Sequence, residues 1–214
     1  MKPLIVTGTD TGIGKTVVAA MLTAALDGVY WKPIQAGSHG VTDTVRVKQL
    51  TGLPDSHFRS ERYVLRNPLS PHRAAELDNL TIDLDDLALP QDVPPGRHLI
   101  IEGAGGVLVP LNRNTLQIDL FTRWQAPVVL CARTSLGTIN HSLLSLEALK
   151  RRGIPVLGVA FVGEPMPDSE RTIVEFGETK RLGRLPMLRE LDSHALVEAF
   201  DKHFSRQDFE IVDG

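Results

Sequence analysis

The segment Gly8–Thr16, with the sequence GTDTGIGKT, carries residue types that could hold a nucleotide. It follows the apolar run Leu4–Val6 and precedes the apolar run Val17–Leu22, an order typical of a strand, a glycine-rich turn and a helix start. Consecutive backbone N–H groups and a helix N-terminus form a positively polarised cradle for phosphate. Lys15 could reach the β- and γ-phosphates there, and the Thr16 hydroxyl could bind Mg²⁺. The segment therefore predicts a phosphate-binding loop rather than an ordinary strand-to-helix turn.

This loop is one residue longer than the usual phosphate-binding pattern. That pattern has a glycine five positions before the glycine of Gly-Lys-Thr, and Thr9 occupies this position here. The glycine stands one position earlier, at Gly8. We interpret the loop as a lengthened variant, because the Gly-Lys-Thr residues, the strand before them and the helix after them all agree.

The composition is ordinary for a soluble globular protein, with 42% hydrophobic and 23% charged residues. The length of 214 residues favours a single domain spanning 1–214. The formal net charge of -3 shows no basic excess, so neither nucleic acid nor a membrane is expected as a partner. No apolar run approaches the roughly 20 residues of a membrane-spanning helix. The single cysteine, Cys131, and the lack of a secretory pattern after Met1 lead us to expect a cytoplasmic protein.

Short apolar runs alternate with helical patterns, which is typical of a parallel sheet covered on both faces. The expected strands are Leu4–Thr7, Val29–Lys32, Leu99–Glu102, Val128–Cys131, Val156–Val162 and Arg181–Leu185. The expected helices are Lys15–Leu26, Thr44–Leu50, Gln117–Trp124, Ile139–Arg152, Ser169–Phe176 and Ser193–Phe204. Helix ends with left-handed backbone are expected at Gly28, Gly52 and Gly153. The pattern predicts an α/β fold of the P-loop NTPase kind, with a doubly wound, mostly parallel sheet and helices on both faces.

Ligands of such sheets bind beyond the carboxyl ends of the strands, where several polar residues are expected. Lys32 closes one strand and could hold an anionic group or simply extend its ammonium to solvent. Glu102 closes another before Gly103–Gly106, and it could bind Mg²⁺ or be a solvated residue of a turn. Asp43 opens a helix, where acids are favoured for structural reasons. It would also be chemically sensible as an oxygen ligand of Mg²⁺ beside Thr16 and Glu102.

A further helix start follows the strand that contains Cys131. The residues Gly137–Asn140 form this start, and a helix N-terminus can receive a carboxylate or a phosphate. We interpret His141, in the first turn, as structural. We interpret Cys131 as a buried core thiol, and Trp31 and Trp124 as core residues.

Four blocks of residues, in this order, resemble the dethiobiotin synthetase family, the ATP-dependent ring-closing enzymes of biotin synthesis. The blocks are Thr7–Thr16, Lys32–Gly37, Glu102–Gly106 and Leu136–His141. Asn67–His72 and Leu182–Pro186 are similar to further family segments. Any one block is a weak signal, but four in order are specific, and together they cover nearly the whole chain.

The resemblance implies roles for matching positions. Lys32 and Lys15 would be catalytic, and Thr16, Asp43 and Glu102 would hold Mg²⁺. The substrate would contact Thr11, Ala36, Gly137, Thr138, Ile139 and Asn140. The nucleotide and its metal would be bound by Gly12, Ile13, Gly14, Lys15, Thr16, Val17, Asp43, Glu102, Gly103, Ala104, Gly105, Val162, Gly163, Glu164, Pro186, Met187 and Leu188.

The resemblance also implies a reaction and its partners. The substrates would be 7,8-diaminononanoate, CO₂ or bicarbonate, and ATP. One amine would capture CO₂ as a carbamate, which would attack the γ-phosphate to give a carbamic–phosphoric anhydride. The second amine would then displace phosphate and close the ureido ring. The active site would be shared across a homodimer, with Gly137–Asn140 receiving the substrate carboxylate from the partner subunit.

Two departures from the family pattern bear on specificity. Ala36 stands where the family often has Ser or Thr near the substrate, so a hydroxyl contact is missing. Val162-Gly163, or Gly163-Glu164 with a shift of one residue, stands where the family often has an Asn-Asp pair that reads adenine. Neither Val162 nor Gly163 carries a side-chain amide, so we expect weaker discrimination among nucleoside triphosphates.

Two other protein classes are alternatives. ParA/MinD-like nucleotide switches carry a lysine early in the loop, whereas Thr9–Thr11 occupy the early positions here. Synthetases similar to cobyrinate diamide synthase use a glutaminase domain with a nucleophilic cysteine, whereas Cys131 lies in a predicted strand. Both alternatives fit the chain less well than a ring-closing ligase does.

Overall fold

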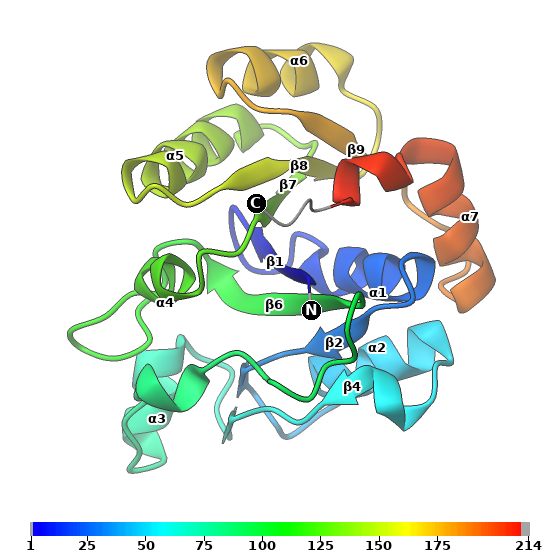
Figure 1. Ribbon diagram of the computed structural model, residues 1–214. Helices are drawn as coiled ribbons and strands as arrows, with labels where there is room; N and C mark the ends of the chain where they lie inside the picture. Colours follow the sequence, from blue (N-terminus) through cyan, green and yellow to red (C-terminus); the bar gives the residue numbers. More distant parts are fainter. Residues whose placement is uncertain (1, 211–214) are drawn as a thin grey trace.

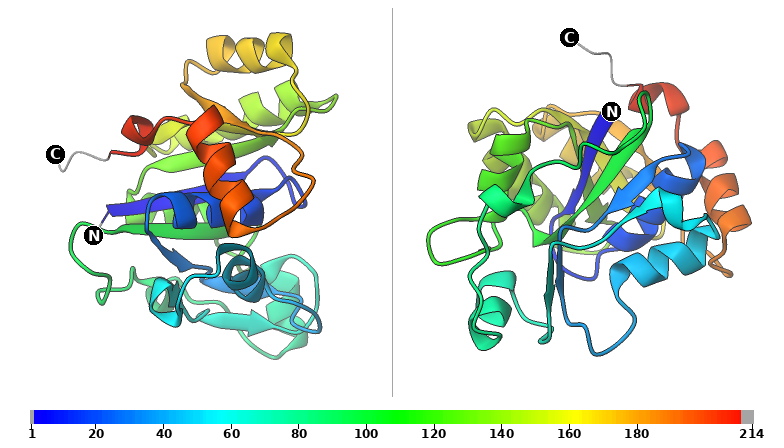
Figure 2. Two further views of the ribbon diagram at one scale, coloured as in Figure 1. Left: turned by 90° about the vertical axis from the view of Figure 1, so that its right-hand side faces the viewer. Right: turned by 60° about the horizontal axis from the view of Figure 1, so that its bottom comes forward.

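The computed structural model describes residues 2–210 and contains a seven-stranded parallel sheet with helices on both faces (Figures 1 and 2). The strand order is β4-β2-β6-β1-β7-β8-β9, which reads upward in Figure 1. The strands are β1 (Lys2–Gly8), β2 (Val29–Trp31), β4 (Phe58–Arg59), β6 (His98–Gly106), β7 (Val128–Arg133), β8 (Val156–Val162) and β9 (Arg181–Leu185). A second, two-stranded parallel sheet joins β3 (Ile34–Ala36) to β5 (Tyr63–Leu65). The predicted doubly wound α/β fold is confirmed.

Alternation along the strands divides the core between the two faces of the sheet. On β1, Leu4 and Val6 pack in the cluster that contains α1 and α7, whereas Ile5 packs in the cluster that contains α4, α5 and α6. Both faces are covered, which is why the strands read as continuous apolar runs. The helices are α1 (Lys15–Ala25), α2 (Asp43–Thr51), α3 (Pro71–Leu77), α4 (Gln117–Trp124), α5 (Thr138–Arg151), α6 (Pro167–Phe176) and α7 (Ser193–His203).

This alternation also decides which polar side chains can meet. Tyr30 on β2 and Ile100 on β6 are register partners and pack in the cluster on the α1 face. Two residues along β6, Glu102 therefore points to the same face. Lys15 and Thr16 begin α1 on that face. Residues about 70 positions apart in sequence are thus brought to one corner by strand pairing.

The six predicted strands are present, and the predicted helices agree with α1, α2, α4, α5, α6 and α7 to within one or two residues. The short strands β3, β4 and β5 are additional. They contain two or three residues each, too few to show a periodic apolar pattern. Helix α3 begins where the sequence predicts a helix start, since Ser70-Pro71 is typical of an N-cap followed by proline, although no range was predicted for this helix.

The end of β6 differs from the prediction. The strand continues past Glu102, so Gly103–Gly106 is strand rather than a turn. Gly106 pairs with Gly8 of β1 after a register shift. The buried Gln117 side chain holds this segment, because it accepts from the Ala104 N–H at 2.6 Å and donates to the Gly106 carbonyl at 3.2 Å.

Two of the three predicted helix-end glycines are confirmed. Gly52 has φ 64° and Gly153 has φ 63°, each in the left-handed region. The prediction for Gly28 is wrong, because Asp27 takes the left-handed conformation with φ 50°. Gly28 is instead closely packed: a Cβ there would lie 3.1 Å from Cγ1 of Ile100.

The sequence interpretation of the core residues is confirmed. Cys131 is fully buried on β7, and burial raises the pKa of its thiol to about 12. Trp31 and Trp124 pack together with ring centroids 5.8 Å apart. Across residues 2–210, none of the helices combines the length and the apolar character needed to cross a membrane.

Candidate active site

The predicted phosphate loop lies between β1 and α1, and glycines fit its shape at two places. Gly14 is the N-cap of α1 with φ 97°, a conformation that favours glycine. Gly8 lies under the loop, where a Cβ would come within 2.4 Å of the Ile13 side chain. The first N–H groups of α1 have no side-chain cap, so they are available to an anion.

Lys15 is folded back across this loop. Its Nζ donates to the Asp10 carbonyl at 2.7 Å, and the residue is only 6% exposed. Burial and the neighbouring Lys32 lower the pKa of Lys15. The ammonium is thus held at the phosphate loop in a poorly solvated position.

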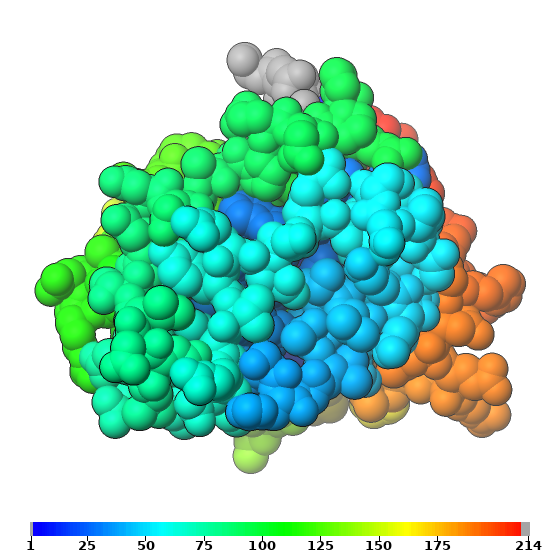
Figure 3. All heavy atoms as spheres, turned by 90° about the horizontal axis from the view of Figure 1, so that it is seen from below, coloured from blue at the N-terminus to red at the C-terminus, as the bar shows by residue number. Residues whose placement is uncertain are grey.

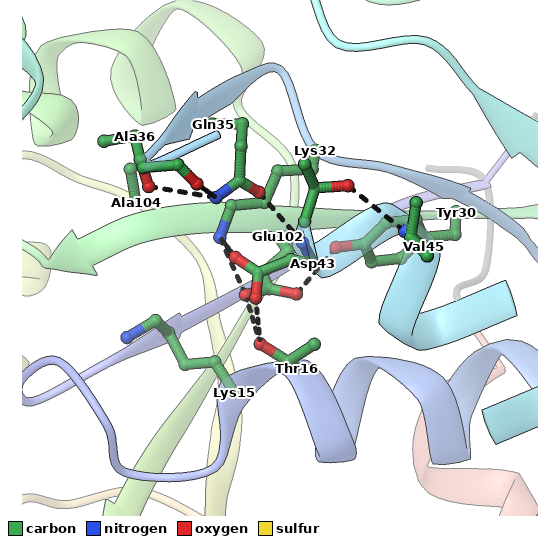
Figure 4. A network of polar contacts seen from close by, with 12 residues as sticks. Lys15, Thr16, Tyr30, Lys32, Gln35, Ala36, Asp43, Val45, Glu102 and Ala104 are labelled. Carbon is green, nitrogen blue, oxygen red and sulfur yellow. Dashed lines mark hydrogen bonds and ion pairs between the residues drawn. The ribbon is translucent and has the colours of Figure 1, made fainter. Parts of the chain in front are cut away.

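Four side chains from four segments converge beside the loop (Figure 4). The Thr16 hydroxyl lies 2.9 Å from Glu102 Oε1 and 3.2 Å from Asp43 Oδ1. Lys32 Nζ lies 2.8 Å from Glu102 Oε1 and 2.7 Å from Asp43 Oδ2. The structure therefore brings together Thr16, Lys32, Asp43 and Glu102, as their places at strand and helix ends led us to expect.

Lys32 and Glu102 are buried, Thr16 and Asp43 are partly buried, and the charges of the cluster depend on one another. Lys32 is 5% exposed and Glu102 is 1% exposed. Burial by itself would lower the pKa of Lys32, but Glu102 and Asp43 outweigh burial and raise it. Burial would raise the pKa of Asp43, but the Lys32 ammonium and the Thr16 hydroxyl lower it. Lys32 and Asp43 are accordingly both charged at neutral pH.

Asp43 is positioned by groups that the sequence analysis did not single out. It is the first residue of α2, after the N-cap Thr42, whose hydroxyl accepts from the Val45 N–H at 3.3 Å. The Gln35 side chain accepts from the Asp43 N–H at 3.0 Å and donates to the Ala36 carbonyl at 3.0 Å. Gln35 therefore ties β3 to the start of α2.

A cleft of about 800 Å³ opens over the cluster. It collects Thr11, Gly12, Gly14, Lys15, Thr16, Val17, Lys32, Ala36, Asp43, Glu102, Ala104 and Gly105 from the predicted site. Its other lining residues are Ile34, Gln35, Arg46, Pro68, Leu69, Ser70, Pro71 and Val109. Most of these come from the segments between β2 and α3. Figure 3 shows the surface that this part of the chain forms, coloured blue to cyan.

The remaining predicted residues lie outside this cleft. Ile13 and Gly103 are buried behind it. Gly137–Asn140 begins α5, at the end of β7, with Gly137 and Asn140 exposed. Thr9–Thr11 and the next turn of α5, at His141, line a second hollow of about 390 Å³. His141 is exposed and lines this hollow, which its interpretation as a structural residue did not anticipate.

The predicted base-binding segments lie beside the phosphate loop at the ends of β8 and β9. A Cβ on Gly14 would lie 3.0 Å from the Val162 side chain, so these two residues are in contact. Gly163 is already bonded through both backbone groups: its N–H donates to the Leu185 carbonyl at 3.0 Å, and its carbonyl accepts from Arg184 at 2.8 Å. Glu164 and Met187 are exposed, and Pro186 and Leu188 are partly buried.

Known proteins match this chain over most of its length. A family model described as AAA domain matches residues 2–195. The chain is 58% identical over 208 residues to the ATP-dependent dethiobiotin synthetase BioD of Rhodopseudomonas palustris strain HaA2, covering 97% of this chain and 96% of that protein. It is 56% identical to the protein of the same name from Novosphingobium aromaticivorans, covering 98% and 100%.

Solved structures show how widely the fold is shared. MinD from Pyrococcus horikoshii, complexed with Mg-ADP, matches with a TM-score of 0.54 at 11% identity, covering 94% of this chain and 95% of that one. The Aquifex aeolicus MinC:MinD complex matches with a TM-score of 0.56 at 13% identity, covering 100% and 98%. These likenesses establish a P-loop fold, whereas the sequence identity establishes the family. The chain belongs to the family of ATP-dependent dethiobiotin synthetases.

Proposed function

We propose that this chain carboxylates 7,8-diaminononanoate with CO₂ and closes the ureido ring of dethiobiotin, using ATP and Mg²⁺. The observation that carries the proposal is the buried cluster of Thr16, Lys32, Asp43 and Glu102 beside the phosphate loop, in a chain that belongs to this family. Such a cluster combines oxygen donors for a metal with an ammonium for an anionic substrate.

The donor set suits Mg²⁺. The described residues 2–210 contain no group of three His, Cys, Asp or Glu side chains that could hold a metal by themselves. Mg²⁺ in nucleotide sites is held by one or two carboxylates together with substrate phosphates, which matches Asp43, Glu102 and the Thr16 hydroxyl. When bound there, the ion would neutralise phosphate charge.

The two lysines have separate roles in the proposal. Lys15 exchanges the Asp10 carbonyl, now 2.7 Å away, for oxygens of the β- and γ-phosphates. Lys32 keeps two of its three N–H donors on Asp43 and Glu102 and directs the third into the cleft. A carbamate held there would present its oxygen to the γ-phosphate that it attacks.

The chemistry needs no covalent protein intermediate. An amine of the substrate adds to CO₂ and loses a proton, which gives a carbamate. A carbamate oxygen forms a bond to the γ-phosphorus while the bond to ADP breaks. The second amine attacks the carbonyl carbon, phosphate leaves and a proton is released. Lys15 and Lys32 stabilise the charge that moves in these steps, and the cleft holds the groups in line.

The site is also proposed to be completed by a second copy of the chain. Gly137–Asn140 lies outside the cleft in its own chain. Around the second hollow, Leu108 and Leu144 are about half exposed, and nearby Leu136 is fully exposed. Such a group of apolar side chains at a surface favours protein contact. It supports a homodimer in which the start of α5 binds the carboxylate of the partner's substrate.

The first test is the coupling of phosphate release to the substrates. We expect ADP and phosphate to form only when diaminononanoate and bicarbonate are both present, with one dethiobiotin for each ATP. A coupled ADP assay and mass spectrometry of the product measure both quantities. Phosphate release that is indifferent to both compounds would instead indicate a nucleotide switch of the ParA/MinD kind.

The Lys32→Ala substitution tests the role of the ammonium. We expect turnover to fall by about 10²–10³-fold, because a charge that stabilises the reacting groups is removed. Lys48→Ala is the matched control, since Lys48 pairs with Asp55 at 2.8 Å on the exposed side of α2. Circular dichroism checks that both variants fold. Near wild-type turnover in folded Lys32→Ala would show that Lys32 is not catalytic.

Base selectivity follows from the ends of β8 and β9. We expect ATP, GTP and CTP to support turnover with kcat/KM values within about tenfold, because Val162 and Gly163 offer no side-chain amide and the backbone groups of Gly163 are occupied. Sites that read a group by hydrogen bonds discriminate by far more. Steady-state kinetics with each nucleotide measures the ratio, and a sharp preference for ATP alone would contradict this expectation.

A shared site predicts complementation between two defective variants. Lys32→Ala and Asn140→Ala are each expected to be weakly active, whereas their mixture regains activity because mixed dimers contain one intact site. The two variants are mixed and left to exchange subunits, and the coupled ADP assay then measures the activity of the mixture. A mixture no more active than its components would indicate that each chain works alone.

A further inference from the structure

The hydroxyl of Tyr30 contacts one carboxylate oxygen of Glu102, Oε2. Tyr30 lies on β2 with 0% of its surface exposed. Its O–H donates to Glu102 Oε2 at 2.8 Å, and the bond is buried (Figure 4). The other oxygen, Oε1, carries the contacts to Thr16 and Lys32. The two oxygens of one carboxylate therefore have different partners.

This arrangement fixes the carboxylate in two ways. The ring of Tyr30 is held by backbone pairing on both sides of β2 and by an edge contact with Phe58, with ring centroids 6.4 Å apart. A rigid donor at Oε2 opposes rotation of the Glu102 carboxylate. It also occupies that oxygen, so that Oε1 alone faces Thr16 and the cleft.

We propose that Tyr30 is a positioning residue that restricts Glu102 to coordination of the metal through one oxygen, and so favours Mg²⁺ over Ca²⁺. The inference rests on the proposed function, because it takes Glu102 as a ligand. Mg²⁺ requires compact octahedral geometry, whereas Ca²⁺ accepts more ligands and binds carboxylates through both oxygens. A carboxylate that offers only Oε1 to the cleft, because Oε2 is held by Tyr30, suits the smaller ion.

Removal of the hydroxyl should loosen this restriction without changing the shape of the core. Tyr30→Phe removes one oxygen atom and keeps the ring. Oε2 of Glu102 then loses its donor, and the carboxylate is free to turn both oxygens toward a metal. Loss of a hydrogen bond that orients a metal ligand typically costs 10–100-fold in metal affinity.

The experiment measures metal binding rather than turnover. Mn²⁺ replaces Mg²⁺ as the probe, and free Mn²⁺ is followed by electron paramagnetic resonance in solutions of the protein with ADP. Ca²⁺ is then added to displace it. For Tyr30→Phe we expect Mn²⁺ affinity about tenfold weaker than in the wild type, and a higher ratio of Ca²⁺ to Mn²⁺ affinity. A merely structural role for Tyr30 would lower the melting temperature but leave that ratio unchanged.

Tyr63→Phe is the matched control, since Tyr63 is the other tyrosine of the chain and also donates to a carboxylate. Its hydroxyl contacts Asp86 at 2.6 Å, and neither residue lines the cleft. This variant should bind both ions as the wild type does. If the wild type binds Mn²⁺ and Tyr30→Phe has the same Mn²⁺ affinity and the same ratio of Ca²⁺ to Mn²⁺ affinity, the role of Tyr30 is overturned. The proposed metal site then still stands. Absence of Mn²⁺ binding in the wild type would overturn the proposed metal site and this inference with it.

Discussion

The pairing of one buried ammonium with two carboxylates is the interaction on which the site depends. Asp43 and Glu102 approach the same Thr16 hydroxyl, and two like charges so close together in a poorly solvated place repel strongly. Lys32 lies 2.7 and 2.8 Å from them and compensates both. It thereby joins the start of α2, the middle of β6 and the segment after β2. The phosphate loop closes the cluster through Thr16, so its geometry is set before any ligand arrives.

Much of the fold and of the site could be predicted from the sequence. The physical reasons for this also explain which residues could not be predicted. Continuous apolar runs predict buried parallel strands, and Gly-Lys-Thr between a strand and a helix predicts the loop. Lys32 and Glu102 were found because each directly follows an apolar run in the sequence. Tyr30 was not found, because a tyrosine within an apolar run is typical of the core. Only the register of β2 against β6 shows that its hydroxyl reaches Glu102. Gln35 and Arg46 were missed because short strands and exposed helix faces leave no periodic signal.

The fold and the family answer different questions here. The MinD structures superpose over most of the chain at 11–14% identity, so sheet order and loop position are properties of a broad architecture. Function depends on the side chains placed on that architecture. In this chain the early loop positions are Thr9–Thr11, and a lysine stands instead after β2, where it meets two acids. Under the proposed function, this lysine lets one wall of the nucleotide site also hold a second anionic reactant.

Charge balance explains why such a surface would be selective for the metal-bound nucleotide. Lys15 and Lys32 together balance Asp43 and Glu102, so the four side chains carry no net formal charge. A nucleoside triphosphate alone would bring only negative charge toward the buried Glu102 and the partly buried Asp43, and the dipole of α1 offsets only part of that repulsion. Under the proposed function, a divalent cation held by those same carboxylates would reverse the local sign and let the phosphates approach. The acids that stabilise the Lys32 ammonium in the interior would then also make nucleotide binding depend on the metal.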